Sequence, residues 1–392
     1  MEAREVDWED PIFALHRGGK IRVESAVPVD SAVVLARAYT PGVAEVCRAI
    51  ARDASLAHTH SIKANTVAVV TDGTAVLGLG DIGPLAAEPV MSGKAMLFRE
   101  MAGVQAFPIC LDTRDPDEIV QTVKLIAPVF GGINLEDISA PRCFEIEERL
   151  DADLDIPVFH DDQHGTAIVV MAALLNALKL TGRRFENTRF VVSGIGAAGI
   201  ACTRMLLEAG ADQIIGFDSA GPLHEGRPGL NGLKRWYASA TNPERFTATL
   251  RQALLGADVF IGLSRGGLLE REDLMEMAPN AIVLALANPE PEVRPEAAAG
   301  TPVAVFATGR SDLPNQVNNV LAFPGVFRGA LDAGATTING AMKLAAARAI
   351  AGCVPPEELE RGRIVPPALD RRVPAVVAAA VSGAAVTTGV VR

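Results

Sequence analysis

The chain has 392 residues, which is more than one ordinary hydrophobic core holds and is typical of two domains. Hydrophobic residues make up 49% of it, and the formal net charge is −11. This acidic balance argues against sequence-independent nucleic-acid binding, which needs a basic face. The five cysteines are scattered and form no C-x-x-C pair, so we expect reduced core thiols in a cytoplasmic protein.

No segment is expected to enter a membrane. The N-terminus reads Met-Glu-Ala-Arg-Glu-Val-Asp, which is acidic and lacks the apolar stretch of a signal peptide. Residues 373–391 carry no charge and are long enough to span a bilayer, but they include Pro374, Gly383 and Gly389. We therefore expect this stretch to form a packed C-terminal helix.

The first half of the chain alternates short apolar strands with helical patterns. A mixed N-terminal stretch, expected to be helical, breaks at Tyr39-Thr40-Pro41-Gly42. The strands predicted after it are Thr66–Val70, Ala75–Leu79, Gln105–Leu111, Gly131–Leu135 and Pro157–His160. The helices predicted between and after them are Ser92–Gly103, Pro116–Ala127 and Gly165–Lys179. Such alternation indicates a parallel sheet wrapped by helices.

A second series of strands and helices begins at Arg189. Its predicted strands are Phe190–Ser193, Gln213–Phe217, Val259–Leu263 and Ile282–Leu286. Asn288-Pro289-Glu290-Pro291-Glu292 is expected to be a loop, because closely spaced prolines cannot continue a helix. Ile338–Ala351 is predicted to be an amphipathic helix, and the tail after it is expected to be mostly helical.

The most informative motif is Gly194-Ile195-Gly196-Ala197-Ala198-Gly199, which follows one predicted strand and opens the next helix. Gly194 permits a tight turn, Gly196 lets the backbone approach a pyrophosphate, and Gly199 lets the helix pack close to the strand. The free N–H groups at the start of that helix favour phosphates. The next strand leads to Asp218, whose carboxylate can accept hydrogen bonds from ribose hydroxyls. Together these features predict a dinucleotide site.

Asp218 also bears on which dinucleotide is bound. An acid at this position repels the 2′-phosphate of NADP, so we expect NAD, with NADP as the alternative if Arg227 reaches the phosphate. The fold class predicted is α/β. It comprises an N-terminal parallel-sheet domain over residues 1–160 and a Rossmann-type dinucleotide-binding domain with C-terminal helices over residues 161–392. A cleft at their junction would suit a ligand.

Two pairs of acids follow predicted strands. Glu136-Asp137 comes after one strand and Asp161-Asp162 after another, at the carboxyl ends where open α/β sheets bind ligands. Several carboxylates in one crevice repel each other unless a cation holds them, and oxygen ligands favour Mg²⁺ or Mn²⁺. Solvated loop acids or helix caps would give the same spacing. A zinc pair of His160 and His164 is disfavoured, because His160 ends a strand and the chain has no H-E-x-x-H motif.

At these residues the chain resembles the malic enzyme family, in the short bacterial form without the phosphotransacetylase-like extension. The resemblance runs from about Phe13 to Ala351. Its ordered motifs are Ala38-Tyr39-Thr40-Pro41-Gly42-Val43-Ala44, Val69-Val70-Thr71-Asp72-Gly73, Leu77-Gly78-Leu79-Gly80-Asp81-Ile82-Gly83, Gly93-Lys94, Asn134-Leu135-Glu136-Asp137, Phe159-His160-Asp161-Asp162-Gln163-His164-Gly165-Thr166-Ala167, Ala287-Asn288-Pro289, Ala307-Thr308-Gly309-Arg310-Ser311-Asp312, Asn315-Gln316-Val317-Asn318-Asn319 and Phe323-Pro324-Gly325.

The resemblance implies oxidative decarboxylation of (S)-malate to pyruvate and CO₂ with reduction of NAD or NADP, a divalent metal and a homodimer. It implies Lys94 as the base that also contacts substrate, and Tyr39 as the proton donor. The remaining implied roles fall on the metal ligands Glu136, Asp137 and Asp162, on the catalytic carboxylate Asp161 beside them, on the substrate amide Asn319, and on Asn288, which is expected near both substrate and nicotinamide.

The chain departs from the family in two places. Ala75 stands where animal-type enzymes carry an arginine, so the substrate carboxylate must be bound differently. The stretch Ser264-Arg265-Gly266-Gly267 is unusual for a loop near the cofactor and leaves the choice of cofactor open. Two other functions remain: a catalytically silent dinucleotide-binding protein, and a hydroxy-acid dehydrogenase that does not decarboxylate. The latter needs no metal, so sensitivity to EDTA would distinguish it.

Overall fold

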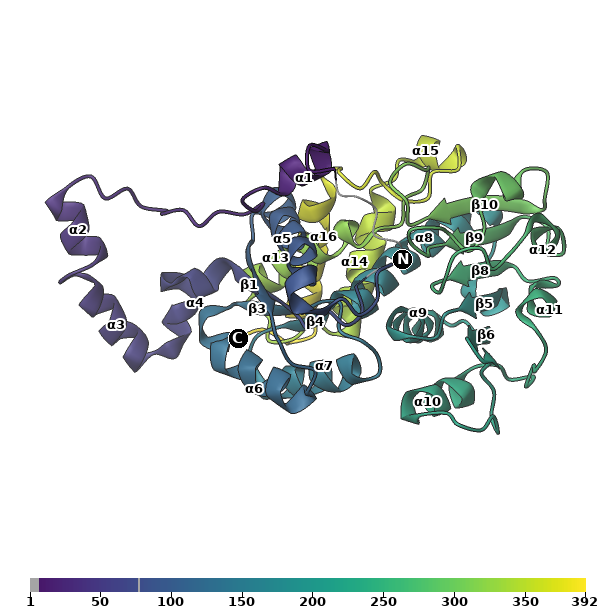
Figure 1. Ribbon diagram of the computed structural model, residues 1–392, viewed down its shortest axis with the longest axis horizontal. Coiled ribbons are helices and arrows are strands. Elements are labelled where there is room, and N and C mark those ends of the chain that lie inside the picture. Colours follow the sequence, from purple (N-terminus) through teal and green to yellow (C-terminus); the bar gives the residue numbers. More distant parts are fainter. Residues whose placement is uncertain (1–6, 77) are drawn as a thin grey trace.

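The computed structural model describes residues 7–76 and 78–392 and contains two mainly parallel sheets joined by helices (Figure 1). The strands are β1 Thr66–Thr71, β2 Gln105–Cys110, β3 Gly132–Leu135, β4 Val158–His160, β5 Arg189–Ser193, β6 Gln213–Asp218, β7 Gly221–Pro222, β8 Val259–Gly262, β9 Ala281–Ala285 and β10 Val303–Thr308. The helices are α1 Pro11–His16, α2 Ala32–Ala38, α3 Val43–Arg52, α4 Ala57–His60, α5 Gly83–Ala102, α6 Pro116–Ile126, α7 Arg142–Asp153, α8 Asp161–Thr181, α9 Ala197–Glu208, α10 Gly232–Ala240, α11 Leu250–Leu254, α12 Arg271–Met275, α13 Phe323–Ala333, α14 Gly340–Gly352, α15 Pro356–Glu360 and α16 Val373–Thr387.

The first sheet has the strand order β2-β1-β3-β4, and all its pairs are parallel. Its central strand β1 is buried on both faces, as expected for a parallel sheet covered by helices. Ala68 and Val70 pack in one core with residues of α6 and α7, whereas Val67 and Val69 pack in another with residues of α5 and α13. The C-terminal helix α13 thus returns to cover the first sheet.

The second sheet has the order β10-β9-β8-β5-β6-β7, parallel except for the short edge strand β7. One face packs with α11 and α12, and the other packs with α8 and α9. A single hydrophobic core runs from the first sheet through α8 to this face of the second. Because α8 lies in that core, residues at its N-terminus are held between the two sheets.

Two apolar helices raise the question of a membrane span. By length and composition α8 could cross a bilayer, but 67% of its apolar window is buried inside the protein, so it is the core helix described above. The uncharged C-terminal stretch forms α16, which buries Val373, Val377 and Val381 and packs against α13 and α14. The expectation of a packed C-terminal helix is confirmed. The N-terminal residues 1–6 lie outside the described residues.

Two predicted elements were wrong. Ala75–Leu79 is not a strand: Val76 and Gly80 exchange backbone hydrogen bonds of 3.0 and 2.8 Å, so the chain reverses on itself instead of entering the sheet. Gly78 and Gly80 permit this reversal at φ 75° and 74°, and Leu77 lies outside the described residues. Helix α5 begins at Gly83 rather than Ser92, so Lys94 lies in the middle of a helix and not at its start.

The remaining predicted strands and the long helices are confirmed to within a few residues, while β10 and β7 were missed. The N-terminal stretch is only partly helical, because an extended segment separates α1 from α2. The structure pairs none of the five cysteines in a disulfide, yet only Cys143 and Cys202 are fully buried and Cys47 is exposed. The expectation of core thiols was therefore wrong for Cys47.

Candidate functional site

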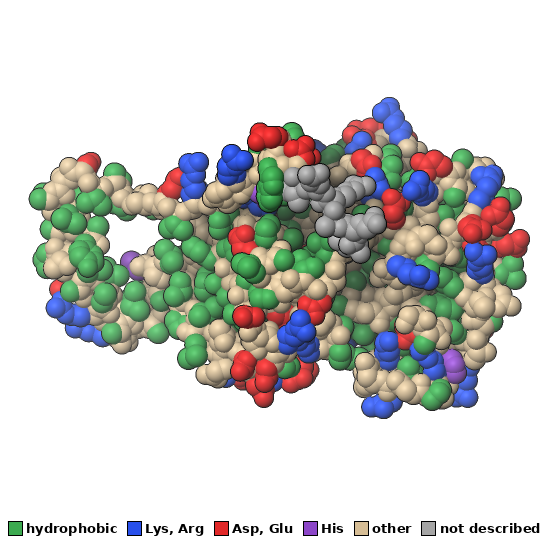
Figure 2. All heavy atoms as spheres, in the orientation of Figure 1, with side chains coloured by type: hydrophobic (Ala, Val, Ile, Leu, Met, Phe, Trp, Pro, Cys, Tyr) green, Lys and Arg blue, Asp and Glu red, His purple; other side chains and the backbone are tan. Residues whose placement is uncertain are grey.

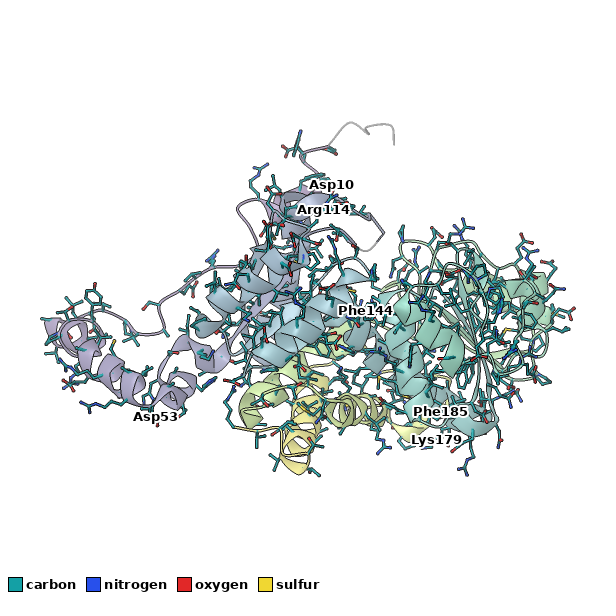
Figure 3. All side chains as sticks on the ribbon, turned by 90° about the horizontal axis from the view of Figure 1, so that it is seen from below. Asp10, Asp53, Arg114, Phe144, Lys179 and Phe185 are labelled. Carbon is teal, nitrogen blue, oxygen red and sulfur yellow. The ribbon has the colours of Figure 1, made fainter. Side chains whose placement is uncertain are left out.

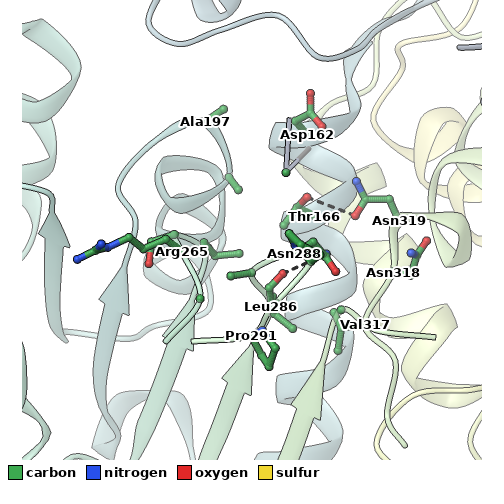
Figure 4. Close-up of a pocket in the computed structure, with 18 of the residues that line it drawn as sticks. Asp162, Thr166, Ala197, Arg265, Leu286, Asn288, Pro291, Val317, Asn318 and Asn319 are labelled. Atoms are coloured by element: carbon green, nitrogen blue, oxygen red, sulfur yellow. Dashed lines mark hydrogen bonds between the residues drawn. The ribbon is translucent and has the colours of Figure 1, made fainter. Parts of the chain in front are cut away.

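A cleft of about 1590 Å³ opens between the two sheets, where the carboxyl ends of several strands meet the N-terminus of α8. Figure 4 shows Asp162 and Thr166 on that helix, with Asn319 hydrogen-bonded to Thr166 and Asn288 below it. A cleft at the strand ends of parallel sheets is the usual place for a ligand in α/β proteins.

Three carboxylates converge at one end of this cleft. Glu136 and Asp137 directly follow β3, and Asp162 lies in the first turn of α8, 25 residues after Asp137 in sequence. One ligand oxygen from each lies within 4.8 Å of the others. The backbone N–H of Asp137 also donates to Asp162 Oδ2 at 2.8 Å, which ties the two loops together. Three convergent carboxylate oxygens suit a hard divalent cation such as Mg²⁺ or Mn²⁺.

The charge balance at these acids supports the same fit. Burial, reinforced by repulsion from Asp162, Asp161 and Asp137, raises the pKa of Glu136 well above its usual range, even though Lys94 opposes the shift. Burial likewise raises the pKa of Asp161. Without further positive charge, the carboxylates of these acids repel one another. A bound divalent cation would reduce this repulsion.

The structure does not group His160 and His164 as ligands of a zinc ion. His160 is fully buried at the end of β4, and His164 pairs with Glu147 at 2.9 Å. Among the described residues, the one group that could hold a metal is the three carboxylates above.

Lys94 extends from the middle of α5 into the acidic cluster. Its amine contacts Asp161 Oδ2 at 2.5 Å, forms an ion pair with Glu136 and lies 4.7 Å from the centre of the Phe323 ring. Burial disfavours its charge, but the carboxylates of Asp161, Glu136 and Asp162 outweigh this effect and raise its pKa above the usual range. The amine is therefore protonated as long as those carboxylates keep their negative charge.

Asp161 joins Lys94 to the opposite wall of the cleft. Its carboxylate is fully buried, and Asn319 donates to Asp161 Oδ2 at 2.9 Å while accepting from the Thr166 hydroxyl at 3.3 Å (Figure 4). Asn288 lines the same cleft beyond them and makes only a long 3.4 Å bond to the Leu286 carbonyl, so its amide is available to a ligand.

The glycine-rich loop forms the dinucleotide end of the cleft. Gly194 has φ 102°, which few other residues adopt, and a side chain at Gly199 would collide with the Gly194 carbonyl at 2.1 Å. By contrast, a side chain at Gly196 would meet nothing within 4 Å, so open space lies where a pyrophosphate would approach. Ala197 and Ala198 begin α9 and line the cleft, and Ile195 is buried beneath the loop. The loop therefore fits a dinucleotide.

Asp218 lies at the end of β6, next to this loop, because Gly194 and Ile195 donate to the Phe217 carbonyl. Its carboxylate does not stand alone: Arg227 and Lys234 both form ion pairs with it, at 2.8 and 2.6 Å. Burial opposes its charge, but these hydrogen bonds and that of the Ala220 N–H keep the pKa of Asp218 below its usual value.

Tyr39 is the one predicted site residue that the structure places elsewhere. It ends α2 on an extended N-terminal arm, here defined as residues 21–61, and 68% of its surface is exposed. Figures 1 and 3 show that this arm, which carries the labelled Asp53, projects away from the body in both views. Tyr39 does not line the cleft of its own chain.

Two acids, the half-buried Glu147 and the buried Glu292, organise the cleft and were missed by the sequence reasoning. Glu147 of α7 accepts the His160 backbone N–H at 2.8 Å and the Gln163 amide at 3.1 Å, and so holds the start of α8. Burial acts against its charge, but interactions led by His164 lower its pKa to about 2. Glu292, which is fully buried, accepts the N–H groups of Ser264 and Ala287 and joins the loops after β8 and β9. Nothing in the sequence distinguishes either acid from its exposed neighbours.

The cations of the cleft are few. Of the described residues that line it, Lys94 is the one beside the acidic cluster. Arg265 points away from Asp162 and Asn288 in Figure 4, and Arg294 pairs with Glu290 at 3.2 Å. The carboxylates of a diacid substrate would need positive charge beyond that of Lys94.

Comparison with known proteins gives matches over most of the chain. Residues 18–151 match the family described as "Malic enzyme, N-terminal domain", and residues 163–386 match "Malic enzyme, NAD binding domain". A curated "NAD-dependent malic enzyme" of Geobacillus stearothermophilus is 58% identical over 99% of this chain and 81% of its own length. A "Bifunctional malic/malolactic enzyme" of Bacillus subtilis (strain 168) is 54% identical over 95% of this chain and 92% of its own.

Solved structures agree with these matches. The crystal structure of an NAD-dependent malic enzyme from Thermotoga maritima superposes with a TM-score of 0.91 at 48% sequence identity. The superposition covers 97% of this chain and 100% of that one, so the two folds correspond over nearly their whole length.

Proposed function

The chain belongs to the malic enzyme family, and we propose that it oxidises and decarboxylates (S)-malate to pyruvate and CO₂ with a nicotinamide dinucleotide and Mg²⁺ or Mn²⁺. The observation that carries the proposal is the convergence of Glu136, Asp137 and Asp162 beside Lys94, in a cleft that also contains the glycine-rich loop. When bound, the metal supplies a Lewis acid for substrate oxygens and the nicotinamide supplies the hydride acceptor.

Lys94 and Asp161 form the base of the first step. A lysine must lose its proton before it can accept one, and Asp161, 2.5 Å away, is placed to take that proton. Neutral Lys94 then removes the proton of the C2 hydroxyl as the C2 hydrogen leaves as hydride, which gives oxaloacetate. Asn319 holds Asp161 in place, and Asn288 is free to bind substrate or nicotinamide.

Decarboxylation then requires an acid for C3, and neither tyrosine of the chain lines the cleft described above. Loss of the C4 carboxylate as CO₂ leaves an enolate, whose C3 must be protonated to give pyruvate. The chain has two tyrosines: Tyr237 is fully buried against Thr203, and Tyr39 lies on the arm. We propose that Tyr39 donates this proton in the cleft of a second copy within a homodimer.

The exposure of the arm supports the proposal of a homodimer. None of the described residues 7–65 is buried, although Val33, Leu35 and Val46 are large apolar residues of α2 and α3. Figure 2 shows hydrophobic side chains over the arm and over the part of the body next to it. Helices as short as these are not stable in water without a packing surface. A symmetric dimer in which each arm covers the other body provides one.

Mixing two inactive variants tests this arrangement. Tyr39→Phe and Lys94→Ala chains are denatured and refolded together, so that mixed dimers form. If Tyr39 acts in the partner's cleft, one cleft of each mixed dimer has both residues, and about a quarter of wild-type pyruvate formation returns. If Tyr39 acts in its own chain, no cleft is complete and the mixture stays inactive, which would refute the proposal. Each variant refolded alone is the control.

The activity itself is tested with purified protein, malate and Mn²⁺, with reduced cofactor and pyruvate measured together. Equal yields of both products are expected, and excess EDTA should stop both. Cofactor reduction without pyruvate would point to a dehydrogenase that does not decarboxylate. Asp162→Ala should lose Mn²⁺ binding in a calorimeter but retain dinucleotide binding, because the glycine-rich loop is separate.

We further propose NAD as the preferred cofactor because of the Asp218 carboxylate at the end of β6, and a cytoplasmic location because the structure pairs none of the five cysteines. The domain division at residues 160 and 161 stays a prediction. In the structure β4 passes into α8 at that point without a loop.

A further inference from the structure

Lys20, which follows α1, is a half-buried cation held by neutral groups alone. Its ammonium donates to the Pro89 carbonyl of α5 at 2.6 Å and lies 3.0 Å from His16 Nε2. His16 Nδ1 lies 2.8 Å from the Ile12 carbonyl, which can only accept, so Nδ1 carries the ring hydrogen and Nε2 accepts from Lys20. No carboxylate of the described residues forms an ion pair with Lys20. An ammonium has three N–H donors, so one is left for a ligand.

The ammonium of Lys20 lies on the side of α5 that forms a wall of the cleft. Val90, Gly93 and Leu97 line the cleft from α5, and their helical spacing places them on one face of that helix. Gly93 leaves the place beside this face to Lys20, because a Cβ at Gly93 would lie 3.2 Å from Lys20 Nζ. The residue after Gly93 is Lys94, the proposed base. Lys20 therefore stands at the edge of the cleft, close to the reacting end.

The charges at this end of the cleft call for a further cation. The three carboxylates of the proposed metal site and that of Asp161 meet there, with Lys94 as the lining cation beside them. When these acids are ionised, Lys94 and one divalent cation still leave negative charge in excess, and malate brings two more carboxylates. Ala75 also lines the cleft and offers no charge. A cation at the edge of the cleft would reduce the repulsion that the substrate meets.

We infer that Lys20 binds the C4 carboxylate of malate, the one remote from the C2 hydroxyl. The inference rests on the proposed oxidation of malate and names a residue that recognises this substrate. Lysine has a flexible four-carbon stem, so the ammonium can turn from the Pro89 carbonyl to the charged acceptor, which binds it more strongly. Lys20 moves no proton at C2 or C3. Because pyruvate has no C4 carboxylate, the contact ends when CO₂ leaves and does not retain the product.

Lys20→Met, which keeps the length of the side chain but not its charge, tests this role. (S)-Malate is compared with (S)-2-hydroxybutyrate, in which a methyl group replaces the C4 carboxylate. Both are titrated by calorimetry into the full chain with Mn²⁺ and reduced cofactor, which prevents turnover. The variant should bind malate about 10- to 100-fold more weakly, as for loss of one charge-assisted hydrogen bond, and 2-hydroxybutyrate within about threefold of the wild type.

Steady-state kinetics separate a binding role from a chemical one. In Lys20→Met the KM for malate should rise while kcat changes much less, because the contact is the same in the ground state and during hydride transfer. Lys20→Arg, which restores a charge, should recover part of the malate affinity. Arg17→Met is the matched control. It removes an exposed cation of the same segment whose side chain has no hydrogen bond or ion pair among the described residues, and it should alter neither constant.

Two results would overturn the inference. If Lys20→Met weakens malate and 2-hydroxybutyrate equally, the lysine only holds its segment against α5, and if it weakens neither, the lysine does not meet the substrate. Lys20→Gln, which keeps a donor for the Pro89 carbonyl but not the charge, repeats the comparison if the methionine variant unfolds. Wild-type protein that binds the cofactor but not malate would refute the proposed activity instead, so the two failures are distinguishable.

Discussion

Lys94 illustrates how a few contacts decide the state of a reacting group. The lysine is buried, and burial alone would lower its pKa, yet Asp161 and Glu136 keep it charged. Asp161 and Glu136 are themselves buried, so their surroundings screen charge weakly. A positive charge bound between them would therefore also act on the lysine and favour its neutral form. The residue is thus suited to switch between a charged and a neutral amine within one site.

Lys94→Ala should remove the base of the oxidation step. We expect malate oxidation to fall by roughly 10²–10⁴. Reduction of supplied oxaloacetate by reduced cofactor should fall equally, because it is the same proton transfer in reverse. Steady-state rates in both directions check this, with dinucleotide binding by calorimetry as the control. Normal oxaloacetate reduction by the variant would exclude Lys94 as this base.

Tyr39→Phe should affect a different step. Pyruvate formation should slow by roughly 10²–10⁴, the range for loss of a general acid. Oxaloacetate reduction should change little, since it never protonates C3. The two rates are measured on the same preparation, and unchanged dimer mass in solution serves as the control. Equal loss of both reactions would mean that Tyr39 and Lys94 work as one coupled proton network.

At the scale of elements, α8 connects the chemistry to the core. Its apolar length lies in the core shared by both sheets, and its first turn carries Asp161 and Asp162. Glu147 fixes that turn from α7. Gly165 leaves room for the Asp161 carboxylate, because a side chain at Gly165 would lie 1.9 Å from Asp161 Oδ1. The helix therefore positions Asp161 in this way only while residue 165 lacks a side chain.

Gly165→Ala should displace Asp161 from Lys94 and Asn319, because the added side chain would lie 1.9 Å from Asp161 Oδ1 and the carboxylate would have to move. We expect kcat to fall by about 10², as for a misplacement near 1 Å, with dinucleotide binding retained. Gly383→Ala in α16 is the matched control, because a side chain there meets nothing within 4 Å. It should leave kcat unchanged and stabilise the fold slightly. Full activity of Gly165→Ala would contradict the proposal that Gly165 keeps Asp161 in its catalytic position.

At the scale of the whole molecule, the body and the arm have different bases for their stability. The body contains hydrophobic cores that extend through both sheets, whereas the arm, residues 21–61, contains no buried residue. The arm also carries the residue that completes the proposed chemistry. Assembly and catalysis are therefore coupled in this proposal: whatever detaches the arm from a partner also removes the acid.

Leu35→Glu on α2 tests that coupling. Leu35 is 48% exposed in the single chain and would be covered in the proposed dimer. An unpaired charge there should weaken the dimer by roughly 3 kcal/mol, about 100-fold. As the protein is diluted, its sedimentation coefficient and its rate of pyruvate formation should then fall together. Leu255→Glu, at the exposed leucine that directly follows α11, is the control and should change neither. An active Leu35→Glu monomer would refute the assembly.

The sequence by itself determined the alternation of strands and helices, the glycine-rich loop and the acids at the strand ends. These follow from local patterns: apolar period, glycine spacing and the position of polar residues after a strand. Because these patterns are local, the strand predicted at Ala75–Leu79 was wrong. Its apolar residues resemble a strand, but Gly78 and Gly80 reverse the chain.

Only the tertiary structure decided which of those residues meet. It brought Lys94 from α5 to Asp161 and Glu136, gave Asp218 its two cations, and placed Tyr39 outside the cleft of its own chain. Contacts between residues distant in sequence depend on how helices pack over the sheets, and no local pattern records that packing.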